Sequence, residues 1–270
     1  MKTWFWASLG RGRGIVAWGL CALSLTACRI RSNGPRWIET HGHAQVTRVA
    51  GGPMGLLAIG TNGLVYNYPE FGSVWHEWNG QLRPRVIVGT RQGLTYADQA
   101  GHVGKGHNGH VGNPEWILEA PVTALASDAD GRDLYAVADG HVSRLPPGGP
   151  VPGPCREVHA LSIAFAQDQL WVSDGQRLYR GTDNACQPVA GSPSNVTRMS
   201  GLGKRLFVVN ASGDVFRLQE GGAWQQLPRP KKFRADQFPK LHPVQDVAVT
   251  GTAVWAVDDE ANVFVFSESE

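Results

Sequence analysis

Five histidines have spacings that could hold a metal ion. The glycine-rich stretch "GHVGKGHNGH" carries His102, His107 and His110, and "HGH" upstream carries His41 and His43. Imidazoles on such loops can close on zinc or copper. The alternative is a surface loop in which His102 belongs to a strand and no ion is bound. We adopt this alternative and predict neither a metal site nor a cofactor.

Aspartates form a second candidate set, at Asp98, Asp139, Asp174 and Asp258. Such carboxylates could bind calcium or act as an acid–base pair. Each of them, however, lies in a short polar joint between two apolar runs, where tight hairpins favour Asp, Asn and Gly. The segment "DADGRD" at 128–133 resembles the opening of a calcium loop but lacks its distal glutamate. We interpret all of these residues as turn formers.

Catalytic motifs are absent from the sequence. It contains no G-x-S-x-G elbow, no H-E-x-x-H, no phosphate-binding loop and no C-x-x-C. We therefore predict that the protein is not an enzyme.

The segment best suited to ligand binding is a basic insertion, "PRPKKFRADQFPKLHP", between Pro228 and Pro243. Cations beside aromatic rings suit an anionic glycan or an acidic protein partner. The alternative is a solvated insertion with no role in binding. The candidate ligand-binding residues are Arg229, Lys231, Lys232, Phe233, Arg234 and Lys240.

The amino terminus predicts an exported lipoprotein. Residues 1–27 join a basic region to an apolar core, "IVAWGLCALSLTA", which is too short to span a bilayer. "LTAC" ends at Cys28 and resembles the lipobox of bacterial lipoproteins, so we expect a lipidated Cys28 on a linker over residues 28–36. Arg29 stands where Asp would favour inner-membrane retention. We therefore expect the cell envelope, at the outer membrane. An ordinary signal peptide with a chance cysteine is the alternative.

Export also determines how charge and cysteines are interpreted. Cleavage takes Lys2, Arg11 and Arg13 from 25 basic residues and nothing from 23 acidic residues, which leaves a nearly neutral chain. No strong basic field remains, which argues against nucleic acid as a partner. Cys155 and Cys186 would lie in an oxidising compartment, where we predict a disulfide. Two buried free thiols are the alternative.

These residues must be positioned by a repeating unit of three short apolar runs. A first run precedes each middle run, a third follows it, and polar joints such as "TNG" and "DG" connect the second and third. Repeats of about 40 residues with several short strands are typical of β-propeller blades. The middle runs begin at Leu56, Leu94, Leu134, Leu170, Leu206 and Val254, in steps of 36 to 48 residues.

Small residues follow the apolar anchor of most first runs, at Ala50, Ala126, Ala164, Ser200 and Ala248. The innermost strands of a propeller surround a narrow channel, where we expect bulky side chains not to fit. This pattern indicates that the first runs are the inner strands.

A fourth, outer strand is visible in "VWHEW", "EWIL" and "AWQQL", with weaker candidates that begin at Cys155 ("CREV") and Cys186 ("CQPV"). These are five outer strands for six units, and "RWIE" at 36–39 supplies the sixth. The sequence therefore predicts an all-β, six-bladed β-propeller over residues 37–270. Each blade has four antiparallel strands, and the amino-terminal strand closes the last blade.

The last unit resembles a tectonin repeat of the tectonin or tachylectin type. The resemblance rests on "VQDVAVTGTAVWAVDDEANVFVF" and the preceding "AWQQLP". Repeats of this family form six-bladed lectin propellers that recognise bacterial surface sugars, including lipopolysaccharide. A propeller of the regulator-of-chromosome-condensation or quinoprotein-like type is the alternative.

Two functions are consistent with these features, and we expect a monomer in either case. The first is a non-catalytic, carbohydrate-binding module for envelope glycan or lipopolysaccharide. The second is a lipid-anchored scaffold that docks proteins in outer-membrane assembly or secretion. Chain direction places the hairpin turns and the basic insertion on one side of the ring. The amino-terminal strand begins on the other side, with the His-rich loop.

Overall fold

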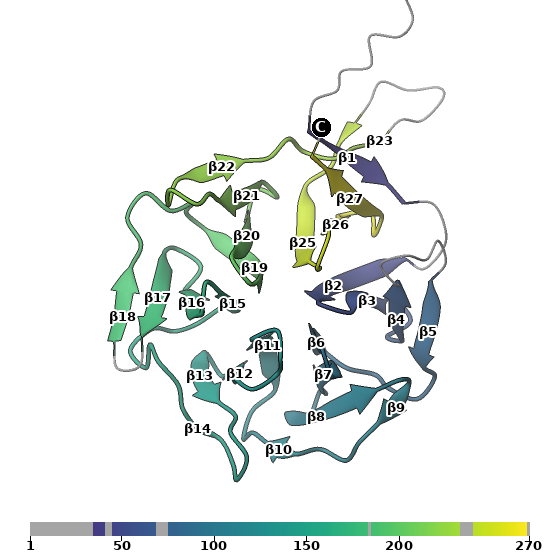
Figure 1. The fold of residues 1–270 in the computed structure, drawn as a ribbon, viewed down its shortest axis with the longest axis vertical. Coiled ribbons are helices and arrows are strands. Elements are labelled where there is room, and N and C mark those ends of the chain that lie inside the picture. Colours follow the sequence, from purple (N-terminus) through teal and green to yellow (C-terminus); the bar gives the residue numbers. More distant parts are fainter. Residues whose placement is uncertain (1–34, 41–44, 69–74, 183–184, 233–239, 269–270) are drawn as a thin grey trace, which may run out of the picture. The chain divides into compact units, whose positions relative to one another are not determined.

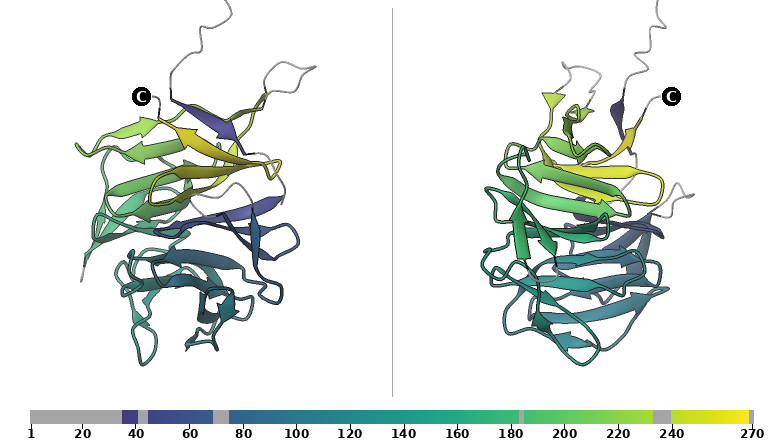
Figure 2. Two further views of the ribbon diagram at one scale, coloured as in Figure 1. Left: turned by 45° about the vertical axis from the view of Figure 1, so that its right-hand side comes forward. Right: turned by 60° about the vertical axis from the view of Figure 1, so that its left-hand side comes forward.

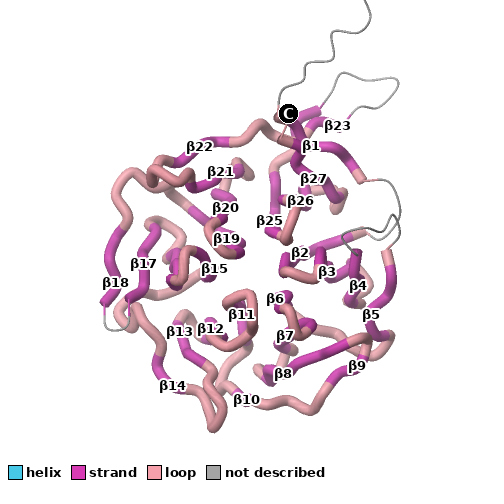
Figure 3. The backbone as a smooth tube through the Cα atoms, in the orientation of Figure 1, coloured by secondary structure: helices cyan, strands magenta, loops and turns pink. Residues whose placement is uncertain are grey.

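The described chain forms a closed ring of six antiparallel sheets (Figure 1). Residues of all six inner strands line a small cavity in the central channel. A computed structural model describes residues 35–40, 45–68, 75–182, 185–232 and 240–268. Their secondary structure consists of strands joined by turns and loops (Figure 3), and this part of the chain contains no helix that could cross a membrane. The predicted all-β, six-bladed propeller is confirmed.

Blades 1 to 3 follow one another along the chain, each from its inner to its outer strand. Blade 1 contains β2 (Val46–Gly52), β3 (Gly55–Gly60), β4 (Val65–Tyr68) and β5 (His76–Asn79). Blade 2 contains β6 (Val86–Thr90), β7 (Gly93–Ala97), β8 (His102–His107) and β10 (Trp116–Ile117), and β9 (His110–Val111) also pairs with β8. Blade 3 contains β11 (Val122–Ser127), β12 (Leu134–Ala138), β13 (His141–Arg144) and β14 (Val151–Pro152).

Blades 4 and 5 repeat this order, and blade 6 takes its outer strand from the amino-terminal side. Blade 4 contains β15 (Ser162–Ala166), β16 (Gln169–Ser173), β17 (Leu178–Thr182) and β18 (Ala185–Pro188). Blade 5 contains β19 (Val196–Leu202), β20 (Arg205–Asn210), β21 (Val215–Leu218) and β22 (Trp224–Gln226). Blade 6 contains β25 (Val244–Val249), β26 (Val254–Asp258), β27 (Val263–Ser267) and β1 (Arg36–Glu39).

The ring is closed by the amino-terminal strand, as predicted. β1 lies beside β27 (Figure 2) and pairs with it in the register Trp37↔Phe266. The aromatic rings of Trp37 and Phe266 pack with their centroids 5.0 Å apart. Trp37 is buried and its indole Nε1 donates a hydrogen bond to the carbonyl of Pro228 at 2.7 Å. Burying this edge removes an unpaired strand, which would otherwise be a site of aggregation.

The core consists of apolar clusters between neighbouring blades, and small residues let the inner strands approach. Ala50, Ala126, Ala164 and Ala248 are all buried, as the pattern of small residues predicts. The inner strands of blades 1 and 6 come closest at Gly51, one residue after Ala50. A Cβ on Gly51 would lie 1.8 Å from the Val249 carbonyl oxygen. Glycine is therefore required where β2 meets β25.

The predicted outer strand of blade 3 is wrong in position. We expected it to begin at Cys155, but the outer strand is β14, where Val151 pairs with Arg144. Cys155 has a φ of +62° and lies in the connection to blade 4, so it cannot extend a strand. Pro152 is tolerated in β14 because the outermost edge needs no further backbone donor.

The two sides of the ring carry different parts of each blade. The hairpins between second and third strands lie on one side, here called the turn face. The third strands end on the opposite side, here called the terminal face, where β1 begins at Arg36. A small hairpin, β23 (Lys231–Lys232) with β24 (Lys240–Leu241), lies in the connection from blade 5 to blade 6 on the turn face.

Candidate functional site

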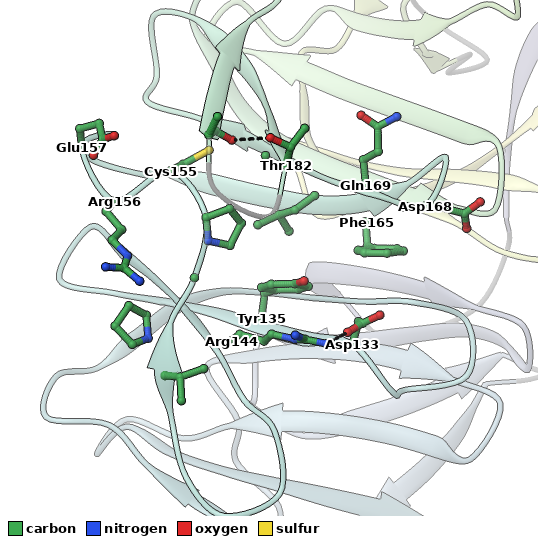
Figure 4. Close-up of a pocket in the computed structure, with 17 residues that line it drawn as sticks. Asp133, Tyr135, Arg144, Cys155, Arg156, Glu157, Phe165, Asp168, Gln169 and Thr182 are labelled. Atoms are coloured by element: carbon green, nitrogen blue, oxygen red, sulfur yellow. Dashed lines mark hydrogen bonds and ion pairs between the residues drawn. The ribbon is translucent and has the colours of Figure 1, made fainter.

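A candidate binding site in the described chain is a cavity between blades 3 and 4 on the terminal face. It has a volume of about 470 Å³ and is here called the slot (Figure 4). Ligand cavities in proteins typically span about 300–1,000 Å³. The slot therefore has room for a small molecule or one or two sugar rings.

Two aromatic rings form an apolar surface in the slot. Tyr135 comes from β12 of blade 3, and Phe165 lies near the end of β15 in blade 4. Their rings are nearly parallel, with an interplanar angle of 14° and centroids 6.2 Å apart (Figure 4). Both side chains are half-buried. The pair provides flat apolar faces that a ring-shaped ligand can contact.

Polar groups surround this aromatic pair. Arg144 on β13 forms an ion pair with Asp133 beside Tyr135 (Figure 4). Asp168 lies in the tight turn from β15 to β16 with a φ of +57°, and Gln169 begins β16. The lining therefore offers hydrogen-bond donors and acceptors around an apolar base, as small-molecule sites commonly do.

A disulfide holds the outer end of the slot. Cys155 and Cys186 are bonded, with their Cα atoms 4.7 Å apart, so the predicted disulfide is confirmed. The two cysteines can bond because the connection after Pro152 crosses from blade 3 to the start of β18 in blade 4. The backbone packs tightly here, since a Cβ on Gly181 would contact Pro154 at 3.1 Å. A cross-linked wall lowers the entropic cost of ordering a binding site.

Sequence reasoning missed the slot, although the repeat contains a signal for it. Tyr135 and Phe165 come from different strands of different blades, so no local motif joins them. The register shows that the position of Tyr135 is aromatic in several blades and faces a cation on the third strand. These cross-strand pairs are Tyr135↔Arg144, Trp171↔Arg180 and Phe207↔Arg217.

The basic insertion is only partly a free surface. The Arg229 guanidinium is already bonded to blade 5. Its Nε donates to Asp214 Oδ1 at 2.7 Å, and its Nη2 donates to the Ser212 carbonyl at 2.9 Å. The hairpin register brings Lys231 opposite Leu241 and Lys232 opposite Lys240, and Lys231 is exposed. Phe233 and Arg234 lie outside the described residues.

The β8–β9 hairpin pairs His107 with His110, but His102 of the same glycine-rich stretch lies apart from them. His102 Nδ1 lies 2.9 Å from Asp98 Oδ2 in blade 2, near the turn face. His107 Nδ1 lies 2.6 Å from the Gln92 carbonyl, at the other end of β8. His41 and His43 lie outside the described residues.

The aspartates act in turns, as interpreted from the sequence. Asp98 accepts the backbone amides of Ala100 and His102, and Asp174 accepts those of Gln176 and Arg177. Burial raises the pKa of Asp98, but these bonds and those to the His102 ring outweigh it and lower the pKa below its usual value. Asp139 occupies the left-handed region with a φ of +48°.

One cluster in blade 6 has the donor types of a metal site, and sequence reasoning did not single it out. His242 Nδ1 lies 3.1 Å from Asp259 Oδ1 and 3.6 Å from Asp258 Oδ2. Asp258 Oδ1 already accepts hydrogen bonds from the backbone amides of Glu260 and Asn262. The buried His242 side chain therefore contacts carboxylates of the last hairpin and fixes the end of the insertion to it.

No protein-family model matches the chain, and no curated protein sequence is significantly similar to it. Several solved structures share its fold. A protein of unknown function from Bacteroides thetaiotaomicron aligns with a TM-score of 0.60 at 13% identity, covering 87% of this chain and 72% of that one. Virginiamycin B lyase from Staphylococcus aureus aligns with a TM-score of 0.54 at 13% identity, covering 84% and 82%.

A third similar protein is YCF48. The form from Cyanidioschyzon merolae aligns with a TM-score of 0.57 at 11% identity, covering 86% of this chain and 98% of that one. A structure of YCF48 bound to D1 peptide aligns with a TM-score of 0.51 at 14% identity, covering 85% and 79%. Identities this low establish the propeller fold alone, because one fold hosts unrelated functions.

Proposed function

We propose that this protein is a non-catalytic binding module that recognises a glycan in the slot between blades 3 and 4. The observation that carries the proposal is the aromatic pair of Tyr135 and Phe165 beside the Arg144–Asp133 ion pair. A pyranose ring has an apolar C–H face that packs on an aromatic ring, and its hydroxyls need both donors and acceptors. The slot supplies both types of contact.

The sequence features support an envelope glycan, such as lipopolysaccharide, as the ligand. The last repeat resembles those of tectonin-type lectins, and "LTAC" ahead of Arg29 resembles the lipobox of an outer-membrane lipoprotein. In this proposal Cys28 carries the lipid and the linker over residues 28–36 joins the anchor to the propeller. The protein then acts as a lipid-anchored monomer at the outer membrane.

The test is binding of the mature protein to a glycan array, followed by calorimetry with the strongest ligand. Tyr135→Ala should weaken binding by about tenfold, because aromatic contacts contribute about 0.5–1.5 kcal/mol beyond their buried area. Tyr66→Ala removes a half-buried tyrosine from blade 1 and is the matched control. Equal affinity of both variants for the array ligand would move the glycan site away from the slot.

An acidic protein partner docked on the basic hairpin is the second candidate function. Lys231 is exposed, and the register of β23 and β24 sets Lys232 opposite Lys240. The structure of YCF48 with D1 peptide is consistent with peptide binding by a propeller of this kind. If the array shows no glycan ligand and Lys231→Ser with Lys232→Ser abolishes a salt-sensitive protein interaction, the scaffold function is favoured instead.

A further inference from the structure

Six residues occupy equivalent positions near the turn-face ends of the inner strands, which surround the channel. Each pairs with the fourth residue of its middle apolar run, and three of the six are charged. The charged residues come from blades 5, 6 and 1, whose inner strands β19, β25 and β2 lie side by side around the centre (Figure 1). The six residues are Arg48, Val86, Ala124, Ser162, Arg198 and Asp246.

Asp246 is the buried acid of this group. Its Oδ2 accepts the amide of Val49 in blade 1 at 3.1 Å, and its Oδ1 accepts its neighbour Val247 at 3.0 Å. Within the described residues it forms no ion pair with Arg48 or Arg198. The carboxylate therefore holds blade 6 to blade 1 and attracts the arginines only from a distance.

The two arginines have unused hydrogen-bonding capacity. Arg48 is half-buried, and its guanidinium makes no hydrogen bond or ion pair within the described part of the chain. Arg198 donates from Nη1 to the Thr197 carbonyl at 2.8 Å, while its buried Nε has no partner. Burial and the nearby Arg48 lower the pKa of Arg198. The Arg48 guanidinium and the Arg198 Nε are thus hydrogen-bond donors that no residue of the described chain accepts.

The charge count defines what could fill the site. Two guanidinium groups and one carboxylate leave one positive charge, which a single anion would neutralise. A small cavity continues along the channel from Asp246 toward the terminal face, lined by residues such as Val49 and Met199 that follow the two arginines, while Arg48 and Arg198 do not line it and lie at its turn-face end. Guanidinium forks match the oxygens of carboxylate, phosphate and sulfate.

We propose that the turn-face mouth of the channel binds one oxyanion group, a carboxylate, phosphate or sulfate, between Arg48 and Arg198. In this site Arg48 and the Arg198 Nε donate to the anion, and Asp246 fixes the backbone of blades 6 and 1 around it. The site lies on the opposite face from the slot, so it is independent of the glycan proposal.

The test is calorimetric titration of the folded protein with sodium phosphate, sodium sulfate and sodium acetate, each at an ionic strength matched with chloride. Arg48→Gln and Arg198→Gln should each weaken binding by about tenfold or more, because each removes a charged hydrogen-bond donor. Arg132→Gln is the control, since the Arg132 side chain is 81% exposed on a turn of blade 3.

The outcomes separate the proposal from its alternatives. Acetate binding identifies a carboxylate group as the ligand, and phosphate or sulfate binding identifies a tetrahedral anion. Either result supports the proposal if Arg48→Gln reduces it. If Arg198→Gln fails to fold, Arg48→Gln still decides, because the guanidinium of Arg48 makes no hydrogen bond or ion pair in the described fold. Failure of all three anions to bind, or equal binding by wild type and Arg48→Gln, overturns the proposal.

Discussion

Asp174 and Asp246 show how opposite environments act on the same side chain. Burial raises the pKa of Asp174, but hydrogen bonds from the amides of Arg177 and Gln176 and from the Tyr179 hydroxyl outweigh it, and the net pKa is lowered. Asp246 is fully enclosed, and burial raises its pKa despite the nearby arginines and two backbone donors. Local hydrogen bonds therefore lower the pKa of the turn carboxylate, and burial raises the pKa of the channel carboxylate.

A pH-dependent stability effect follows for Asp174. A folded-state pKa below that of the unfolded chain gives stability that is present above about pH 4 and lost as pH falls through the folded pKa. Asp174→Asn should therefore be less stable than wild type at pH 7, and the difference should shrink below about pH 4. Urea unfolding across this range measures it, with Asp139→Asn as a control turn variant. A difference that is constant with pH would contradict the role given to this carboxylate.

Single residues were the least predictable part of this molecule. The turn aspartates could be assigned from the sequence because a hairpin needs only local residues. Tyr135 and Phe165 could not, because their contact depends on how blade 3 faces blade 4. Arg229 was grouped with the basic candidates, yet its guanidinium is held by Asp214. Replacing Arg229 would therefore disturb blade 5 as well as surface charge, which makes Lys231 the cleaner site for testing a basic surface.

At the scale of elements, the closing strand β1 is the clearest test of the fold. Trp37 is 7% exposed and packs on Phe266, so Trp37→Ala should cost about 3–5 kcal/mol of unfolding free energy. Ile38 on the same strand is 43% exposed, so Ile38→Ala should cost about 0.5 kcal/mol or less. Urea denaturation compares the two variants. Similar losses for both would contradict closure of blade 6 by this strand.

The strands were predictable to the extent that the repeat was regular. The inner strands could be predicted from the sequence because they are buried and carry Val, Leu and small residues at fixed spacings. The strand from Val46 to Ala50 is an example. Blade 3 departs from this because a Pro- and Gly-rich stretch supplies only the two residues of β14. Its outer strand contributes little burial, so no hydrophobic pattern marks it. The disulfide, by contrast, was predicted from compartment and cysteine count.

At the scale of the whole molecule, the two faces carry different chemistry. The terminal face holds the aromatic slot and the start of β1, and the turn face holds the channel arginines and the basic hairpin. A ligand on one face therefore need not exclude a ligand on the other. This separation lets the glycan, protein and anion proposals be tested one at a time.

The cellular location of the protein depends on the whole chain, and we expect lipidation of Cys28 to determine it. Labelled palmitate should mark the protein in growing cells, and Cys28→Ala should abolish the label while precursor accumulates. Cys21→Ala, in the apolar core of the same segment, is the matched control and should keep the label. Label retained by Cys28→Ala would contradict the lipoprotein assignment.

The most direct test of the binding-module account is a crystal structure of the protein soaked with the strongest oligosaccharide from the glycan array. The account predicts a sugar ring against Tyr135 and Phe165 in the slot, with its hydroxyls bonded to groups such as Arg144 and Asp168. Tyr135→Ala crystals soaked in the same way should show no ordered sugar there. A sugar ordered on the turn face, with the slot empty in wild-type crystals, would contradict the account.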